Sequence, residues 1–537
     1  MRQDTKIWVL ATAAAAVAWA WMSAGAMAQA TQPSGQDAAS AVKAAEKEPA
    51  VALKPADAAQ GADNEIESFI KATKNPFPWL NWGADIRARN EFVNNLGGVR
   101  STDRRGNVMI LNKDALNHEV DYQRYRTRWW ATVTPVKNVE FYVRLTWEGW
   151  NYCAPDRLPD PSNARLEAWE QRPALSRGWI SERDQVLFDN LYVKLTDIGG
   201  LPITVTAGRQ DIILGEGWLV MDGTPLDGSR TFYFDGIRTT TNLKDIKTTV
   251  DAMWFQIDAQ GDAWLPMMRK TDWPMYETEQ DEMGAILYVT NRSIPNMSIE
   301  PYFMYKQNRH EEPSTSRRSG TDADIYTFGT RVAGTVGKNW KYSANVAGQF
   351  GSRDAPTGIP NNQNICAWAT NNRLSYLFND KWKNEVYFDY EYLSGDRSHR
   401  YQVDGTYEAF DVLWGRYPRW TEGYGFAYAA ESRVFDLGNL HRFGPGWKAS
   451  PTSAIDVGLY YNFLFADENT VYDLNPQNLI FAGGDFRGQL LVPYFKYAFN
   501  NHMFARVMPE FFFPGSYYKD ASNDVGTFVR VEFVFTW

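Results

Sequence analysis

The sequence predicts an all-β protein that closes as an 18-stranded antiparallel transmembrane β-barrel, with short periplasmic turns and long extracellular loops. Three observations support this fold class. Apolar and polar residues alternate after about residue 78, the connections between the alternating segments are short and long in turn, and no apolar run of 18 or more residues follows the N-terminal leader. Because a closed barrel satisfies its backbone hydrogen bonds between strands, it needs no apolar helix to cross a membrane.

The composition excludes several other classes of protein. The chain has 537 residues, of which 15% are aromatic, and this aromatic content argues against disorder. Its 64 acidic and 55 basic residues give a net charge of -9, so we expect no nucleic-acid partner. The two cysteines, Cys153 and Cys366, are too few for a disulfide scaffold. The sequence is compatible with a disulfide bridge between them and equally with two free thiols.

The N-terminus has the features of a secretory signal peptide at residues 1–28. Arg2 and Lys6 precede an apolar run, and the segment closes on the small residues Ala26 and Ala28, after which we expect cleavage. The run is about 15 residues long, shorter than the ~20 that a spanning helix needs, which argues against an uncleaved anchor. We expect residues 29–78 to form a flexible periplasmic tail, in which 65–74 could form a short helix, and residues 79–537 to form the barrel.

The alternation continues to the last residue of the chain. Arg530 and Glu532 fall on one face of the final segment, and the other face holds Val529, Val531, Phe533, Phe535 and Trp537. Segments of this kind are typical of strands with one apolar face. Marking them all predicts strands near 79–92, 118–134, 139–152, 185–197, 201–213, 231–243, 247–259, 281–292, 296–309, 322–336, 339–351, 364–378, 382–395, 435–449, 453–466, 485–499, 502–514 and 525–537.

The connections between these segments support a barrel over other β folds. Long connections such as 93–117 and 396–434 alternate with turns of a few residues such as 499–501. Outer-membrane barrels have short turns on one rim and long loops on the other. The alternative is a soluble β-propeller or sandwich, for which we would expect blade repeats or shorter strands.

The faces predicted to point inward carry many charges. Three arginines alternate on one predicted strand, two on the neighbouring strand, and a sixth lies on the next strand. We predict that these residues form a pore-lining substrate track: Arg124, Arg126 and Arg128, then Arg87 and Arg89, and finally Arg144. Guanidinium groups bind carboxylates and sulfates through forked hydrogen bonds, and a barrel of this size can hold an aqueous channel. The alternative is that these arginines only brace lumen acids such as Asp85 and Glu91.

Residue patterns for catalysis are absent from the sequence. The five histidines are scattered at His118, His310, His399, His441 and His502, without metalloprotease spacing, a nucleophile elbow or a phosphate loop. We therefore expect no enzyme, no metal and no cofactor. A barrel-embedded hydrolase that uses His441 or His399, or a surface adhesin, is the less favoured alternative.

One segment of the sequence resembles a known family. A GRQ followed by a glycine and a later FDG with an arginine resembles the alginate export family of outer-membrane barrels, carried here by Gly208, Arg209, Gln210, Gly215, Phe234, Asp235, Gly236 and Arg238. LSGD at 393–396, FDVLW at 410–414 and GNL at 438–440 are similar to later landmarks of the family. The resemblance covers about 79–537 and implies an eighteen-stranded monomeric barrel that exports a polyuronate.

Together these observations predict a passive outer-membrane channel in a Gram-negative type of cell. The favoured permeant is an anionic poly- or oligosaccharide, and the alternative is a general or uptake porin for small anions or sugars. Expected partners are outer-membrane lipid, the permeant, the barrel-assembly machinery, which the terminal Trp537 fits, and a periplasmic export partner. We expect a monomer.

Overall fold

The computed structural model divides into two compact units, Met1–Val51 and Ala52–Trp537, and only the second contains residues that can be described. The described residues are 67–70, 73–94, 101–102, 108–109, 119–157, 176–181, 186–221, 233–258, 280–309, 322–354, 362–397, 405–415, 419–421, 438–469, 482–519 and 525–537. No helix among them is long and apolar enough to cross a membrane.

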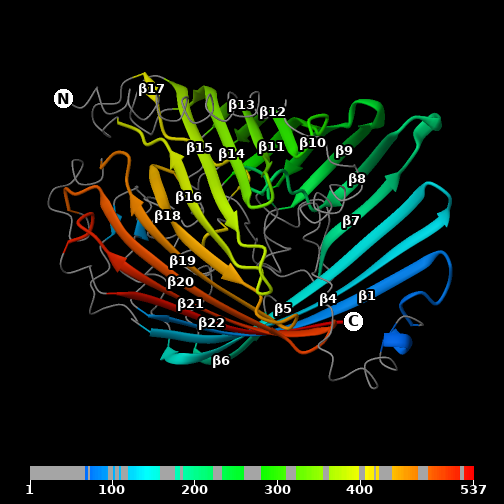
Figure 1. Cartoon of the computed structure of the whole chain (residues 1–537), viewed down its shortest axis with the longest axis horizontal. Helices are drawn as coiled ribbons and strands as arrows, with labels where there is room; N and C mark the ends of the chain where they lie inside the picture. Colours follow the sequence, from blue (N-terminus) through cyan, green and yellow to red (C-terminus); the bar gives the residue numbers. More distant parts are fainter. Residues whose placement is uncertain are drawn as a thin grey trace. The chain divides into compact units, whose positions relative to one another are not determined.

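The described chain is almost entirely one twenty-stranded sheet (Figure 1). Its long strands are β1 (Leu80–Asn94), β4 (Glu119–Val136), β5 (Val139–Arg157), β7 (Leu187–Leu195), β8 (Ile203–Gln210), β9 (Phe234–Leu243), β10 (Thr248–Ile257), β11 (Asp281–Asn291), β12 (Met297–Arg309), β13 (Ala323–Val336), β14 (Trp340–Arg353), β15 (Gln363–Leu377), β16 (Glu385–Leu393), β18 (Leu440–Ala449), β19 (Ile455–Phe465), β20 (Phe486–Ala498), β21 (Met503–Pro514) and β22 (Gly526–Thr536). Short additions are β6 (Ser176–Ser181), which pairs with β5, and β17 (Thr406–Tyr407), which pairs with β15. A separate two-stranded sheet joins β2 (Ser101–Thr102) to β3 (Val108–Met109).

The sheet closes on itself, because β1 pairs with β4 on one side and with β22 on the other. Apart from the two additions, eighteen strands form the closed wall, each antiparallel to its neighbours. The predicted eighteen-stranded barrel is therefore confirmed. Most predicted strands match to within a few residues, as for 281–292 against Asp281–Asn291.

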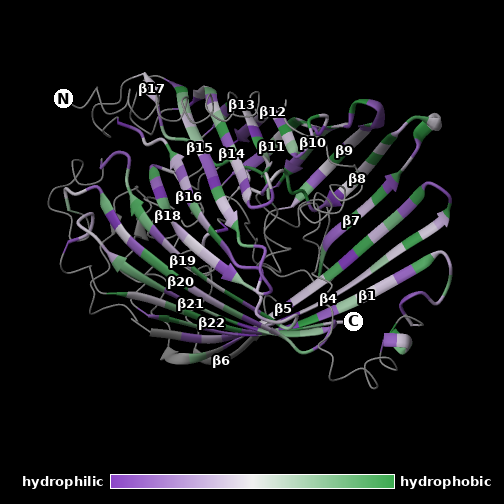
Figure 2. Cartoon of the chain, viewed as in Figure 1, coloured by the Kyte–Doolittle hydropathy of each residue, from purple (hydrophilic) through white to green (hydrophobic). Residues whose placement is uncertain are grey.

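Hydrophobic and hydrophilic residues alternate along the strands of the wall, as the colours in Figure 2 show. In β10, Met253 and Phe255 are buried inside while Trp254 between them is exposed outside. Large apolar side chains such as Ile86 and Phe388 are likewise exposed on the outer face. An outer face of this kind is what a barrel surrounded by lipid presents.

Connections at one end of the barrel, which we call the short-turn rim, contain few residues. They span 137–138, 196–202, 244–247, 292–296, 337–339, 378–384, 450–454 and 499–502, and two of them contain the short 3-10 helices η2 (Ile198–Gly200) and η3 (Lys244–Ile246). Asn138, in the tightest of these turns, has φ 68°, a left-handed conformation that asparagine tolerates. The connections at the other end, which we call the long-loop rim, are longer, and the one from β16 to β18 spans residues 394–439.

Of the segment predicted as a tail, residues 67–70 and 73–78 are described and lie at the short-turn rim. Residues 67–70 are helical, and Trp82 donates its indole hydrogen to the carbonyl of Thr73 at 2.7 Å. The ring of the terminal Trp537 stacks on Trp82 and meets Phe69 edge to face. The two ends of the barrel sequence thus meet at one place on the rim.

Candidate channel interior

The structure brings the predicted arginines of β1 and β4 directly together. Arg87 lies across from Arg126, and Arg89 lies across from Arg124, with all four side chains buried on the inner face. Arg128 continues the row toward the short-turn rim and lies across from Asp85. These five residues form one patch of the inner wall.

Carboxylates from neighbouring strands brace this patch. Arg124 donates to Glu148 of β5 at 2.6 Å and to Glu91 of β1 at 3.3 Å. Arg126 and Arg128 share the carboxylate of Asp85, at 3.2 and 2.6 Å. The bracing considered as an alternative is thus present, and it fixes the guanidinium groups in place.

Further charges extend the patch across the closing seam of the barrel. Arg530 of β22 donates to Glu91 of β1 at 2.7 Å, and Arg89 of β1 pairs with Glu532 of β22. Arg506 of β21 donates to the same Glu532 at 2.8 Å. We call the whole set the basic cluster; it consists of Arg87, Arg89, Arg124, Arg126, Arg128, Arg506 and Arg530 with Asp85, Glu91, Glu148, Glu510 and Glu532.

Seven guanidinium groups against five carboxylates leave the basic cluster with an excess of two positive charges. Most of its members are buried, and the most accessible are Arg506 and Arg128, with side chains 18% and 15% exposed. These two groups are the part of the cluster most accessible to solvent.

Arg144, the sixth predicted arginine, has different partners. Its guanidinium donates to Asp189 at 2.9 Å and to both oxygens of Asp211 at 2.9 and 3.1 Å. Asp211 directly follows β8, where the chain leaves the wall. Arg144 therefore anchors the start of a loop.

Two loop segments fold into the barrel interior, and we call them the inner segments. The first is 211–221, between β8 and β9, and the second comprises 405–415 and 419–421, between β16 and β18. They join through a parallel bridge between Val220 and Trp414, in which Trp414 donates its amide to Leu219 at 2.9 Å and Met221 donates to Trp414 at 3.2 Å.

The inner segments bury an apolar cluster against the wall. Trp414 is fully buried and meets Phe255 of β10 edge to face, and Trp218 stacks on Phe410. The sequence predicts a charged lumen, and the structure adds this apolar core beside the charges. The predicted strand 201–213 ends instead at Gln210, because Ile212 turns inward to join the cluster.

Polar contacts attach the second inner segment to the wall. Lys306 of β12 donates to Asp411 at 3.1 Å and lies 3.7 Å from Glu282 of β11. The indole of Trp414 donates to the same Glu282 at 3.1 Å, and Thr421 donates to Glu510 of the basic cluster at 2.6 Å. The second inner segment is thus attached to β11 and β12 on one side of the barrel and to β21 on the opposite side.

The first inner segment has its own attachments. Arg331 of β13 donates to Glu216 at 2.8 Å and to Glu300 at 2.8 Å, and the indole of Trp218 donates to Glu391 at 2.9 Å. Partial burial acts to raise the pKa of Glu216, but the adjacent Arg331 outweighs it, and the net pKa lies below its ordinary value. Glu216 is therefore charged near neutral pH.

The GRQ and FDG residues join β8 and β9 next to the first inner segment. Arg209 pairs with Asp235 at 2.7 and 2.8 Å, and its guanidinium lies 4.0 Å from the centroid of the Tyr233 ring. Gly208 has φ 125°, and a Cβ there would lie 2.3 Å from the carbonyl oxygen of Leu191, so only glycine fits. Arg209 pairs across the strands with Leu191, whose side chain is exposed on the outer face. The side chain of Arg209 is nevertheless buried.

The remaining motif residues also have structural contacts. The amide of Gln210 donates to the carbonyl of Gly236 at 3.3 Å, and Arg238 donates to Asp251 at 2.9 Å. Phe234 is fully buried and meets Phe255 edge to face within the apolar cluster. Whether any motif residue contacts a permeant stays a prediction.

The later landmarks lie at the neck of the second inner segment. Ser394, from LSGD, accepts the amide hydrogens of Phe410 and Asn439 at 3.0 and 3.3 Å through its carbonyl. The 410–414 landmark is the part of the inner segment that meets Val220. The sequence motifs do not locate these residues in the fold, although apolar residues inside a long loop indicate burial.

Two of the five histidines and both cysteines lie within the described residues. His441 lies 3.3 Å from Asp467 and 3.2 Å from the hydroxyl of Tyr390, whereas His502 contacts the carbonyl of Thr536. The other histidines lie outside the described residues. Cys153 and Cys366 are both free thiols, and no group of metal-ligating side chains occurs in the described part of the chain.

A closed antiparallel barrel with an apolar outer face, a charged inner wall and inner segments packed against that wall defines an outer-membrane channel. The chain belongs to the alginate export family, whose model, described as "Alginate export", matches residues 79–532. Both the family and the fold are of the channel type, and the outer face contacts membrane lipid. No curated protein matches the chain.

Several solved structures are similar to this chain at low sequence identity. OccAB4 of Acinetobacter baumannii is 11% identical with a TM-score of 0.47, over 86% of this chain and 100% of that chain. A BenF-like porin from Pseudomonas fluorescens Pf-5 is 11% identical with a TM-score of 0.47, over 85% and 98%. OpdK of Pseudomonas aeruginosa, solved with vanillate, is 10% identical with a TM-score of 0.46, over 85% and 98%.

Proposed function

We propose that this channel passes an anionic poly- or oligosaccharide by diffusion, with the short-turn rim on the periplasmic side. The observation that carries the proposal is the excess of two positive charges in the basic cluster on one inner wall. A fixed charge of one sign in a pore attracts permeants of the other sign. Arg506 and Arg128 supply its accessible edge.

The bracing acids contribute to this role. Because Asp85 and Glu532 hold Arg128 and Arg506 through short ion pairs, both guanidinium groups are positioned before a solute arrives. A passing carboxylate then gains forked hydrogen bonds without the cost of ordering long side chains. The binding stays weak, since the permeant competes with an internal carboxylate, and weak binding permits release.

The second candidate is a porin that takes up small anions or sugars. The inner segments favour it, because their bridge between Val220 and Trp414 occupies lumen that a polymer would need. Under the first proposal the segments must move aside, whereas under the second they set the pore size.

Single-channel recording of the refolded protein in a planar bilayer tests the proposal. We expect a reversal potential that shows anion selectivity, and current block by added polyuronate. Arg128→Gln and Arg506→Gln should reduce both effects, while Lys381→Gln, which removes a charge from an exposed turn, should change neither. An unblocked pore that conducts small carboxylates would favour the second candidate, and cation selectivity would exclude the anionic permeant.

Several expectations belong to the same proposal. They are cleavage after Ala28, recognition of Trp537 by the barrel-assembly machinery, a periplasmic partner for the N-terminal tail, and a monomeric state. Each is expected of a channel that is secreted across the inner membrane and inserted into the outer membrane.

A further inference from the structure

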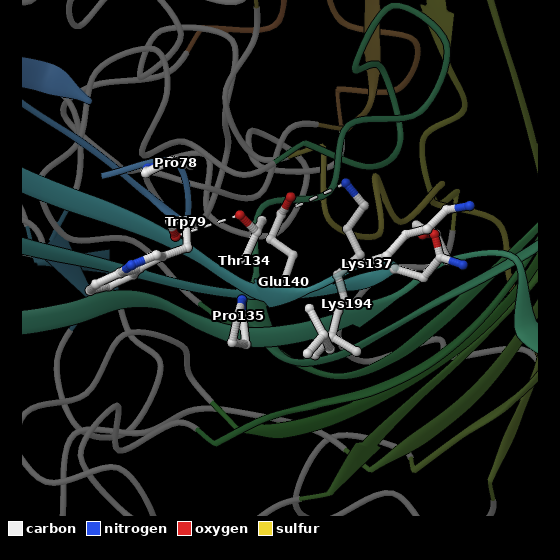
Figure 3. A pocket seen from close by; sticks show the side chains of 11 residues that line it. Pro78, Trp79, Thr134, Pro135, Lys137, Glu140 and Lys194 are labelled. Atoms are coloured by element: carbon white, nitrogen blue, oxygen red, sulfur yellow. Dashed lines mark hydrogen bonds and ion pairs between the residues drawn. The ribbon is translucent and has the colours of Figure 1, made fainter. Parts of the chain in front are cut away.

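A pocket of about 410 Å³ lies at the short-turn rim (Figure 3). It is lined by the residues just before β1, the end of β4, the turn into β5, the start of β5 and the end of β7, which contribute Trp79, Thr134, Lys137, Glu140 and Lys194. Figure 3 shows Trp79 on one side of the pocket and the two lysines on the other. This volume lies within the roughly 300 to 1,000 Å³ typical of small-ligand sites.

The strand register places part of the pocket lining on the lumen side of the wall. Glu140 and Lys194 lie across from each other, and two residues further along the same strands lie Tyr142 and Tyr192. The residues between them, such as Phe141, are exposed on the outer face. The side of the pocket formed by Glu140 and Lys194 therefore faces the channel mouth.

The lining combines three kinds of contact. Trp79 is 46% exposed, and Phe77 stacks on one side of its ring at 5.2 Å, which leaves the other side for a ligand. Lys194 lies 3.7 Å from Glu140, and both side chains are partly exposed. Lys137 is exposed and forms no ion pair with any residue that the structure describes.

We propose that this pocket binds one hexuronate unit and is the entry site of the channel. The indole of Trp79 would cover the apolar C–H face of the sugar ring, as aromatic side chains do with apolar surfaces. A lysine ammonium group would pair with the carboxylate, and Glu140 would accept hydrogen bonds from the hydroxyls. This inference rests on the proposed anionic saccharide and names its first contact.

Residues further inside continue the site toward the basic cluster. The rings of Tyr142 and Tyr192 stack at 5.0 Å, one step inward from Glu140 and Lys194. Trp130 follows on β4, and Arg128 is the next inward-facing residue of that strand. A chain of sugars that enters past Trp79 thus meets aromatic rings and then arginine.

The test measures block of single-channel current by a hexuronate trimer, with the neutral trimer maltotriose as the comparison ligand, added to each chamber in turn. Trp79→Ala should weaken hexuronate block from one chamber about two- to tenfold, and Trp79→Phe should weaken it less. Trp382→Ala is the matched control, because Trp382 lies in another short turn and is also 46% exposed. The double variant Lys137→Gln with Lys194→Gln should lose the preference for hexuronate over maltotriose.

The outcomes separate this inference from the function on which it rests. If hexuronate blocks the unaltered channel but Trp79→Ala matches it, or matches the change seen with Trp382→Ala, the entry site is refuted while the channel proposal stands. If the lysine variant weakens both trimers equally, the hexuronate assignment is refuted. If hexuronate does not block the unaltered channel from either side, the proposed function fails, and the entry site fails with it.

Discussion

Replacing Trp414 by alanine should open the channel without unfolding the barrel. Trp414 is fully buried where the two inner segments meet, packs on Phe255 and donates to Glu282 at 3.1 Å. Truncation of a buried tryptophan costs about 3 to 5 kcal/mol. This loss should weaken the attachment of the inner segments to the wall and leave the strand pairing unchanged, because Trp414 takes part in none of the backbone hydrogen bonds between the strands of the wall.

A loss of this size shifts the balance between attached and released segments by roughly a hundred- to a few thousand-fold. We expect larger mean conductance and longer open states in a planar bilayer, with unchanged strand content by circular dichroism. The control is Trp340→Ala, which removes a half-exposed tryptophan from the outer part of β14. An unchanged conductance in a correctly folded Trp414→Ala channel would show that the inner segments do not limit the pore.

Three further changes test other parts of the structure. Arg209→Met leaves the Asp235 carboxylate without its forked partner and should lower the free energy of unfolding in denaturant by about 3 to 5 kcal/mol, with Arg209→Lys recovering part of the loss. Gly446→Ala places a Cβ 2.1 Å from the ring of Tyr387 and should cost about 1 to 3 kcal/mol, and it should be tolerated in a Tyr387→Ala background. Because the folded pKa of Glu216 is lowered, its contact with Arg331 is fully present above the unfolded pKa and is lost as the pH falls through the folded pKa. Conductance should therefore rise only in acid, below the ordinary pKa of a glutamate, and Glu216→Gln should remove this dependence.

The sequence predicts the wall of this channel well because each strand carries its own signal. A period of two over more than ten residues, with turn residues at both ends, marks β11 or β22 without information from any other part of the chain. The alternation also places Arg87 and Arg124 on the inner face. Both are local properties.

The inner segments and the bracing depend on contacts that are distant in the sequence. Glu91 meets Arg530 only because the first and last strands pair, and the register of that pair is not written in either strand alone. Trp218 and Trp414 are recognisable as apolar residues in long loops, but their contact depends on how two loops fold within the lumen. Local patterns do not contain this information.

The seam between β1 and β22 has a consequence for how the barrel closes. Arg89 faces Glu532 and Glu91 faces Arg530 across it. A slip of two residues in one direction would place Glu91 opposite Glu532 and would lose both ion pairs. A slip in the other direction would place Arg89 opposite Arg530, although it would also bring Arg87 opposite Glu532. The charges at this seam therefore favour the observed register over both slips, since each slip replaces two opposite-charge pairs by at least one like-charge pair.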